Sequence, residues 1–201
     1  HLDQLLQAGT EAMRDPAGGK IERDSKGNPT GLFVDKARTL VEQAIPTQTA
    51  ADEDEALDLS QQQLLAFGIT AVGSMSTSMD DWKTFRRAGE AGRLKVRLVS
   101  YMNAPEAADS NQAPTPWLYG DRLRLIGVKL FADGALGSRG AWLKQPYADM
   151  PNTRGLPRRT DAEYLAAADA AAARGFQIAT HAIGDAANAQ VISAYEQLSR
   201  K

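Results

Sequence analysis

The sequence predicts an α/β fold in which parallel strands are covered by helices. Two observations lead to this class. Short apolar segments alternate along the chain with segments of helical pattern. These apolar segments also run almost without polar interruption, which is typical of parallel strands buried on both faces. Four such βα units fit half of an eight-stranded barrel or a small doubly wound sheet, and the pattern leaves both open.

The N-terminal part of the chain is polar and rich in turn residues. Residues 1–31 are therefore expected to form a peripheral loop or small β excursion, and residues 32–201 to hold the βα units. Residues 34–45 have a helical pattern that stops at Pro46. Residues 49–68 are predicted as a longer helix, because acidic residues stand at its start and a glycine at its end.

Strands and helices then alternate to the end of the chain. The predicted strands are residues 69–75, 94–102, 125–132 and 176–185. The predicted helices are residues 80–92, 160–175 and 186–201, and the predicted loops are residues 103–121 and 132–159. Two helix starts match a capping box, Ser78 with Asp81 and Thr160 with Glu163, in which two side chains bond the first free backbone N–H groups. The loop at 132–159 is long, and long ordered loops are usually functional.

Composition excludes several classes of function. The net charge is −2 and no basic stripe is present, so neither nucleic acid nor a membrane is expected as a partner. The absence of cysteine excludes disulfides, thiolate metal sites and a cysteine nucleophile. No apolar run could span a bilayer, and the first residues resemble no signal peptide, so we expect a soluble protein of the cytoplasm or periplasm. The missing initiator methionine indicates the interior of a longer gene product.

Lys129 is unusual because it stands within the apolar third strand. Side chains alternate along a strand, so Lys129 should share a face with Phe131, while Val128 and Leu130 face the other way. An unpaired ammonium among apolar residues tends to lose its proton. Lys129 is therefore interpreted as paired with Asp133 or reaching solvent, or as a Schiff-base nucleophile, a general base or a lysine carboxylated by CO2.

A second group of candidates lies around the fourth strand and in the long loop. His181 ends that strand, and it is either a satisfied rim histidine or a ligand for a zinc-like metal. Asp185 follows as a helix N-cap or a catalytic group. Arg139 and Arg154 could clamp a carboxylate substrate, or simply be solvated. The glycine-rich stretch after Lys129 is read as turn chemistry rather than a phosphate loop, because it matches neither phosphate motif.

Three segments in combination closely resemble the amidohydrolase superfamily, in its family 3 branch. They are GVKLFADGALGSRGA at 127–141, PYADMPNTRGL at 146–156 and GFQIATHAIGDAAN at 175–188. That branch includes N-substituted formamide deformylases and proteins labelled exoenzyme regulatory proteins. Two upstream segments, PAGGKIERDSKGNPTGLFVDKA and LLAFGITAVGSM, resemble the same branch, so the resemblance extends over nearly the whole chain.

The resemblance implies a fold, a reaction and a metal site. The fold is part of a (β/α)8 barrel, with about four parallel strands that correspond to the second to fifth βα units. The activity is hydrolysis of amide or related C–N bonds of a small molecule by water activated on one or two divalent metal ions, zinc being favoured. Lys129 is implied as a carboxylated metal ligand and His181 as a second ligand, while Asp133 and Arg139 are carried as substrate-binding candidates.

The chain also departs from the family pattern. The family needs a His-x-His on the first strand, another histidine on the sixth and an aspartate on the eighth, and none of them is present in this sequence. That aspartate is the usual general base, so we expect these 201 residues alone to be inactive, with metal absent or weakly bound. Open sheet edges also predict a homo-oligomer. Two other functions stay open, a Schiff-base lysine enzyme and a non-catalytic ligand-binding or regulatory barrel.

Overall fold

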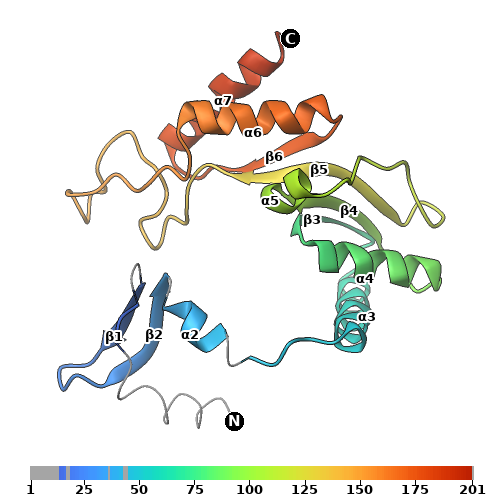
Figure 1. Cartoon of the computed structure of the whole chain (residues 1–201), viewed down its shortest axis with the longest axis horizontal. Coiled ribbons are helices and arrows are strands. Elements are labelled where there is room, and N and C mark those ends of the chain that lie inside the picture. Colours follow the sequence, from blue (N-terminus) through green and yellow to red (C-terminus); the bar gives the residue numbers. More distant parts are fainter. Residues whose placement is uncertain (1–13, 17–18, 36, 43–44, 201) are drawn as a thin grey trace. The chain divides into compact units, whose positions relative to one another are not determined.

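The computed structural model describes residues 14–16, 19–35, 37–42 and 45–200, and these belong to two compact units, residues 1–49 and 50–201. The first unit contains the strands β1 (Gly19–Arg23) and β2 (Pro29–Asp35), which pair antiparallel, and the short helix α2 (Arg38–Glu42) (Figure 1). The turn of this hairpin is held by Asp24, whose carboxylate accepts the backbone N–H of Lys26 and of Asn28.

The division of the chain at residue 31 stays a prediction. A small β excursion exists, but it extends through Asp35, and the residues up to 13 lie outside the described part. The helix predicted over 34–45 is wrong at its start, because Val34 and Asp35 pair with β1 instead. The β-branched valine continues the strand pattern of the residues before it, and pairing with a neighbouring strand outweighs weak helix propensity.

The second unit is built on a sheet of four parallel strands in the order β3-β4-β5-β6. These strands are β3 (Ala71–Thr77), β4 (Arg97–Asn103), β5 (Leu123–Phe131) and β6 (Gln177–His181). The helices are α3 (Ala50–Ala66), α4 (Met79–Glu90), α5 (Ala104–Asp109), α6 (Asp161–Ala173) and α7 (Asp185–Leu198). The α/β prediction is confirmed. A doubly wound sheet would reverse its strand order, whereas this sheet adds each strand beside the last, as a barrel does.

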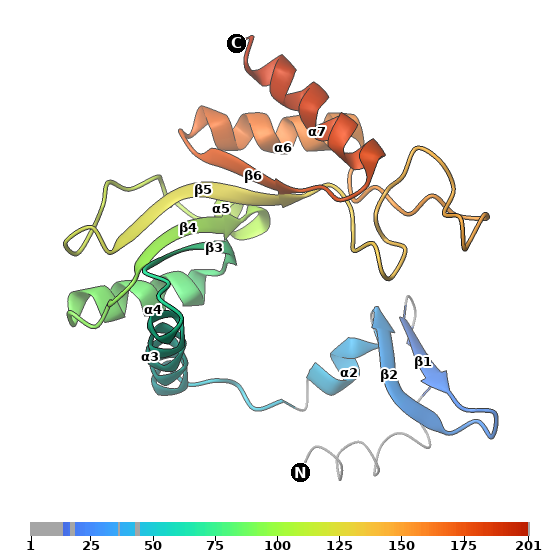
Figure 2. The same ribbon diagram turned by 180° about the vertical axis from the view of Figure 1, so that it is seen from behind.

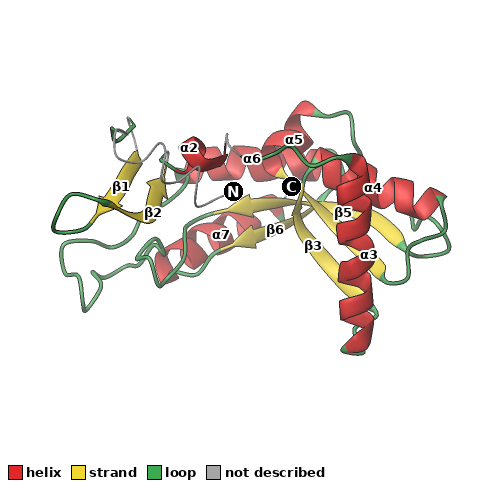
Figure 3. Ribbon diagram, turned by 90° about the horizontal axis from the view of Figure 1, so that it is seen from below, coloured by secondary structure: helices red, strands yellow, loops and turns green. Residues whose placement is uncertain are grey.

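One face of this sheet is covered by helices. Leu98, Met102, Leu123, Leu125 and Val128 of β4 and β5 pack there with Trp82 and Ala88 of α4 and Ala171 of α6. Leu130 of β5 packs beside them with Tyr164 and Ala168 of α6 and with Ala187 and Val191 of α7. Figure 2 shows α6 and α7 lying over β5 and β6, and α3 packs against α4 (Figure 3). We call the opposite face, which carries Tyr101, Lys129 and His181, the inner face.

The strand order leaves β3 and β6 at the two edges of the sheet. Unpaired edge strands can pair with another chain, so self-association stays a prediction. Among the described residues, no helix is both long enough and apolar enough to cross a membrane.

One helix, α5, lies where the sequence predicts a loop, within residues 103–121. Asn103 caps its start by accepting the backbone N–H of Glu106, and Pro105 fits the first turn. The Arg174 guanidinium donates to the backbone oxygens of Ala107 and Ser110 at its other end. A helix this short is stabilised mainly by such tertiary contacts, which the local pattern does not report.

Both predicted capping boxes are present. Thr160 Oγ1 accepts the backbone N–H of Glu163, and the Glu163 carboxylate accepts that of Thr160 at 2.8 Å. At the other end of α6, Gly175 has φ +81°, a conformation that glycine adopts without strain. Ser78 and Asp81 form the equivalent box at the start of α4.

The cap on α6 supports a first prediction. Thr160→Ala removes the side-chain acceptor, so the free energy of unfolding should fall by about 1 kcal/mol. Urea unfolding followed by circular dichroism measures the change. The matched control is Ser193→Ala on the exposed surface of α7, which should stay within about 0.5 kcal/mol. Equal effects of the two substitutions would contradict the cap.

Candidate functional site

Lys129 and His181 lie on neighbouring parallel strands, near the ends where both strands finish. Lys129 pairs in register with Ala179, and Phe131 with His181. Paired residues of parallel strands point to the same side, and residues two apart do so too, so Lys129 and His181 share the inner face. The expected alternation is also present, because Val128 and Leu130 are 3% and 1% exposed while Phe131 is 37% exposed.

The Phe131 ring contacts both of these side chains. Lys129 Nζ lies 5.1 Å from the ring centroid, and the His181 ring centroid lies 5.5 Å from it. The pairing of Lys129 with Asp133 is not observed, and Lys129 forms no ion pair with any residue that the structure describes. Partial burial lowers the pKa of the Lys129 ammonium below its usual value, because the charged form loses solvation. Burial therefore makes the neutral amine, the form that reacts with CO2 or a carbonyl, easier to reach than for an exposed lysine.

His181 is held by the segment that follows β5. Its Nε2 lies 3.2 Å from the carbonyl oxygen of Gly134 and 3.6 Å from Asp133 Oδ1. A carbonyl oxygen can only accept, so Nε2 carries the proton of this hydrogen bond. In the neutral ring, Nδ1 then keeps the lone pair that a metal would use, and the backbone carbonyl of Gly134 is a partner of the kind that orients a metal-ligating histidine.

Asp133 is completely buried, and its carboxylate is occupied by the backbone. Its oxygens accept the N–H groups of Trp142, Ile183 and Gly184 at 2.8, 3.0 and 2.8 Å. This carboxylate therefore joins the long loop to the connection between β6 and α7. A contact between Asp133 and substrate stays a prediction.

The start of α7 is joined to the same loop. The N-cap is Gly184, so the capping role predicted for Asp185 is wrong, and the Asp185 carboxylate instead accepts the N–H of Lys144 at 2.8 Å. The Trp142 oxygen accepts the N–H of Ala186. A Cβ added to Gly184 would stand 1.8 Å from that oxygen, so this close backbone approach needs glycine.

The two arginines first considered as substrate clamps lie elsewhere in the long loop. Arg139 forms an ion pair of 2.6 Å with Asp149, and this guanidinium lowers the pKa of the Asp149 carboxyl. Arg154 uses its backbone oxygen to accept the N–H of Leu143. Contact of Arg139 with substrate stays a prediction, and in this structure its guanidinium is paired with Asp149 of the same loop.

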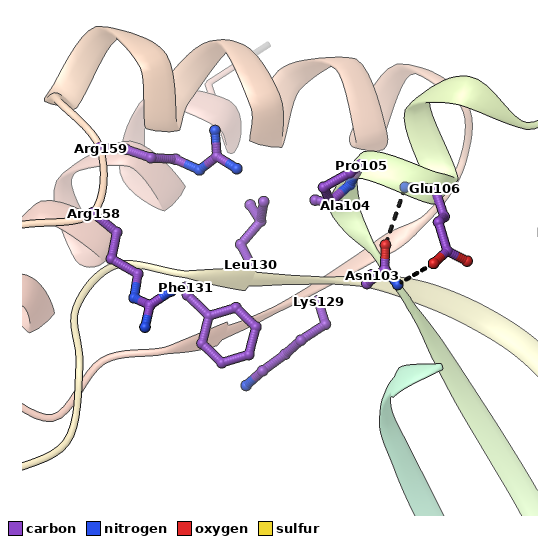
Figure 4. Close-up of a pocket in the computed structure, with 9 residues that line it drawn as sticks. All are labelled: Asn103, Ala104, Pro105, Glu106, Lys129, Leu130, Phe131, Arg158 and Arg159. Atoms are coloured by element: carbon purple, nitrogen blue, oxygen red, sulfur yellow. Dashed lines mark hydrogen bonds between the residues drawn. The ribbon is translucent and has the colours of Figure 1, made fainter. Parts of the chain in front are cut away.

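A pocket of about 660 Å³ opens beside Lys129 (Figure 4). It is lined by Asn103, Ala104, Pro105, Glu106, Lys129, Leu130, Phe131, Arg158 and Arg159. Lys129 alone of the polar residues here was a candidate from the sequence. Asn103 and Glu106 match the helix-capping pattern N-x-x-E directly after a predicted strand, and this pattern could have identified them. No sequence pattern predicts the place of Arg158 and Arg159, because it is the folding of the long loop that brings them beside β5.

The polar residues present can supply part of a metal site. Lys129 in carboxylated form and His181 through Nδ1 are donors of the type that zinc accepts. Over the described ranges, no three His, Cys, Asp or Glu side chains come together in a group that could hold a metal ion. The two donors thus fit a metal whose remaining ligands come from outside this group.

Comparisons with known proteins point to one family. The chain matches the model of the amidohydrolase family over residues 2–201. It is 35% identical to YtcJ of Bacillus subtilis (strain 168), which is named an amidohydrolase only provisionally, over 91% of this chain and 35% of that protein. It is 28% identical to the N-substituted formamide deformylase of Arthrobacter pascens, over 93% of this chain and 36% of that protein. The chain thus spans about a third of the length of these two relatives.

A solved structure agrees with these relatives. The crystal structure of an uncharacterized metal-dependent hydrolase from Pyrococcus horikoshii OT3 superposes with a TM-score of 0.77 at 25% identity. The match covers 98% of this chain and 39% of the other. The four-stranded parallel sheet therefore corresponds to part of a larger barrel of that type.

Proposed function

The chain belongs to the amidohydrolase family, and on that premise we propose that it is part of a metal-dependent hydrolase of amide or related C–N bonds. The observation that carries the proposal is the placement of Lys129 and His181 on one face, at the ends of neighbouring strands. Functional groups of parallel barrels gather at these ends. The formamide deformylase among the relatives supports a small amide as the substrate class.

Each residue has a role in this proposal. The Lys129 amine, whose pKa is lowered by burial, adds CO2 in its neutral form and releases a proton, which gives a carbamate with two oxygen donors. His181 binds through Nδ1 while the hydrogen bond from Nε2 to the Gly134 oxygen fixes its ring. When bound, a divalent metal, zinc by our proposal, polarises the scissile carbonyl and lowers the pKa of water. Asp133 also holds the long loop in place through its three backbone contacts.

Metal removal tests this proposal on the whole protein from which these residues come. Its metal content should be one or two divalent ions per chain by mass spectrometry. Chelation should reduce hydrolysis of a panel of N-substituted formamides and N-acyl amines by at least about 100-fold, and zinc should restore it. The 201-residue chain alone is the control, and it should be inactive because it contributes only two of the donors.

Two results would point to the other functions. Activity that survives chelation, with borohydride trapping a carbonyl compound on Lys129, would support a Schiff-base enzyme. Metal-free protein that binds small molecules without turnover would support a ligand-binding or regulatory barrel. Either result would refute the metal-dependent hydrolase.

A further inference from the structure

The pocket beside Lys129 is rich in positive charge. Lys129, Arg158 and Arg159 line it, and Glu106 is the one acidic residue among its described lining. The Glu106 carboxylate is already used, because it accepts from Asn103 Nδ2 at 2.9 Å and from the backbone N–H of Met79. The Glu106 carboxylate is thus already engaged by neighbouring residues of the protein, whereas the positively charged groups that line the pocket form no ion pair with a carboxylate of the described residues.

Arg158 is held in place without using its hydrogen-bond donors. Its backbone N–H donates to the carbonyl oxygen of Ala132 at 2.8 Å, and this bond fixes Arg158 at the end of β5. Its guanidinium carbon lies 5.6 Å from the centroid of the Phe131 ring. Such a cation–π contact uses none of the five guanidinium N–H groups as hydrogen-bond donors. In the described part of the chain, no side-chain hydrogen bond or ion pair of Arg158 is found.

Arg159 is anchored in a similar way through its backbone. Its carbonyl oxygen accepts from Gln190 Nε2 at 3.1 Å, and the same amide nitrogen donates to Asp161. The Glu163 carboxylate nearby is occupied by the backbone and hydroxyl of Thr160. The Arg159 guanidinium makes no hydrogen bond or ion pair with the residues that the structure describes, but after the bonds from Thr160 its charge contributes to the lowered pKa of the Glu163 carboxyl.

Both arginines line the pocket, but Figure 4 shows Arg158 beside Phe131 on one side of β5 and Arg159 beside Leu130 on the other. Arg158 is thus the arginine that lies with Phe131 and Lys129, and unlike Arg139 it is not paired with a carboxylate of the described residues.

We propose that Arg158 binds a carboxylate group of the substrate, with Arg159 adding positive charge to the same pocket, and that Phe131 supports the apolar part of the same molecule. This inference rests on the proposed function and names its substrate class, an amide that also carries a carboxylate. The planar fork of arginine matches a carboxylate in two parallel hydrogen bonds. Phe131 offers an exposed ring between Arg158 and the side chains of Lys129 and His181. A carboxylate contact at Arg158 is separate from the contacts predicted for Arg139 and Arg154, which stay predictions.

Direct binding gives the first test. Benzoate is titrated into the 201-residue chain and followed by calorimetry, with benzamide as the neutral analogue of the same shape and inorganic phosphate as a second anion. Benzoate should bind at least about 10-fold more tightly than benzamide, and Arg158→Gln together with Arg159→Gln should abolish that preference. Arg86→Gln is the matched control, because Arg86 is an exposed arginine of α4 paired with Glu90.

Circular dichroism verifies that each variant is folded, and single substitutions replace the double variant if it is not. Equal binding of benzoate and benzamide, or a preference that survives both arginine substitutions, would overturn the proposal. Binding of phosphate without binding of benzoate would also overturn it, since it would assign the arginines to a phosphoryl group.

Kinetics of the whole protein separate this inference from the proposed function. For a carboxylate-bearing amide, the arginine substitutions should raise KM by about 10- to 100-fold with little change in kcat, while the carboxamide analogue is unaffected. Metal-dependent activity with no preference for the carboxylate would refute the inference and leave the hydrolase intact. Benzoate binding that depends on the arginines, in a protein without metal-dependent activity, would refute the hydrolase and leave the carboxylate site intact.

Discussion

Replacing Asp133 with alanine should lower the free energy of unfolding of the 201-residue chain by about 3–5 kcal/mol. The carboxylate accepts three backbone N–H groups from segments far apart in sequence, and it is completely buried. Without it, those N–H groups stay buried with no acceptor, and each such loss costs about 1–3 kcal/mol. Asp133→Asn should have a smaller effect, because an amide keeps one oxygen but turns an NH2 group toward the same donors.

Urea unfolding of the variants provides the measurement. Asp149→Ala is the matched control, because its carboxylate is 64% exposed and pairs with Arg139 at the surface. That loss should stay within about 1 kcal/mol. A loss of less than about 1 kcal/mol for Asp133→Ala would show that the loop is held by other contacts.

Lys129→Ala should lower kcat/KM of the whole protein by more than about 100-fold and reduce its metal content. Substitution of groups that merely support a ligand already costs about 10- to 100-fold in metal affinity or activity, so loss of a ligand should exceed that. The fold should survive, since the side chain is partly exposed and contacts mainly the Phe131 ring. Mass spectrometry and the amide panel measure the two effects.

A small carboxylate provides the sharper test of the carbamate. Propionate added to Lys129→Ala should restore part of the activity, because it can occupy the space and offer the oxygen donors of the missing group. Lys83→Ala on α4 is the control, an exposed lysine paired with Asp80, and it should leave kcat/KM unchanged. Normal metal content and activity in Lys129→Ala would remove Lys129 from the site.

Much of the fold follows from local pattern. The predicted strands and helices of residues 50–201 are present, although the fourth strand ends at His181 rather than at Asp185. Both capping boxes form, because capping and alternation depend on residues a few positions apart. The predictions failed where distant contacts decide. Val34 and Asp35 join β2, and α5 is stabilised by Arg174, which lies more than 60 residues away.

In the candidate site, too, local sequence pattern predicts some features and contacts between distant segments decide the others. Alternation along the strand by itself placed Lys129 opposite Val128 and Leu130, and the register of β5 with β6 adds His181 to the same face. The occupation of Asp133 by three N–H groups, the proton on His181 Nε2 and the free arginines in the pocket were decided by tertiary structure alone. The reason is physical: side-chain direction repeats along a strand, whereas hydrogen-bond partners are set only when separate segments of the chain come together.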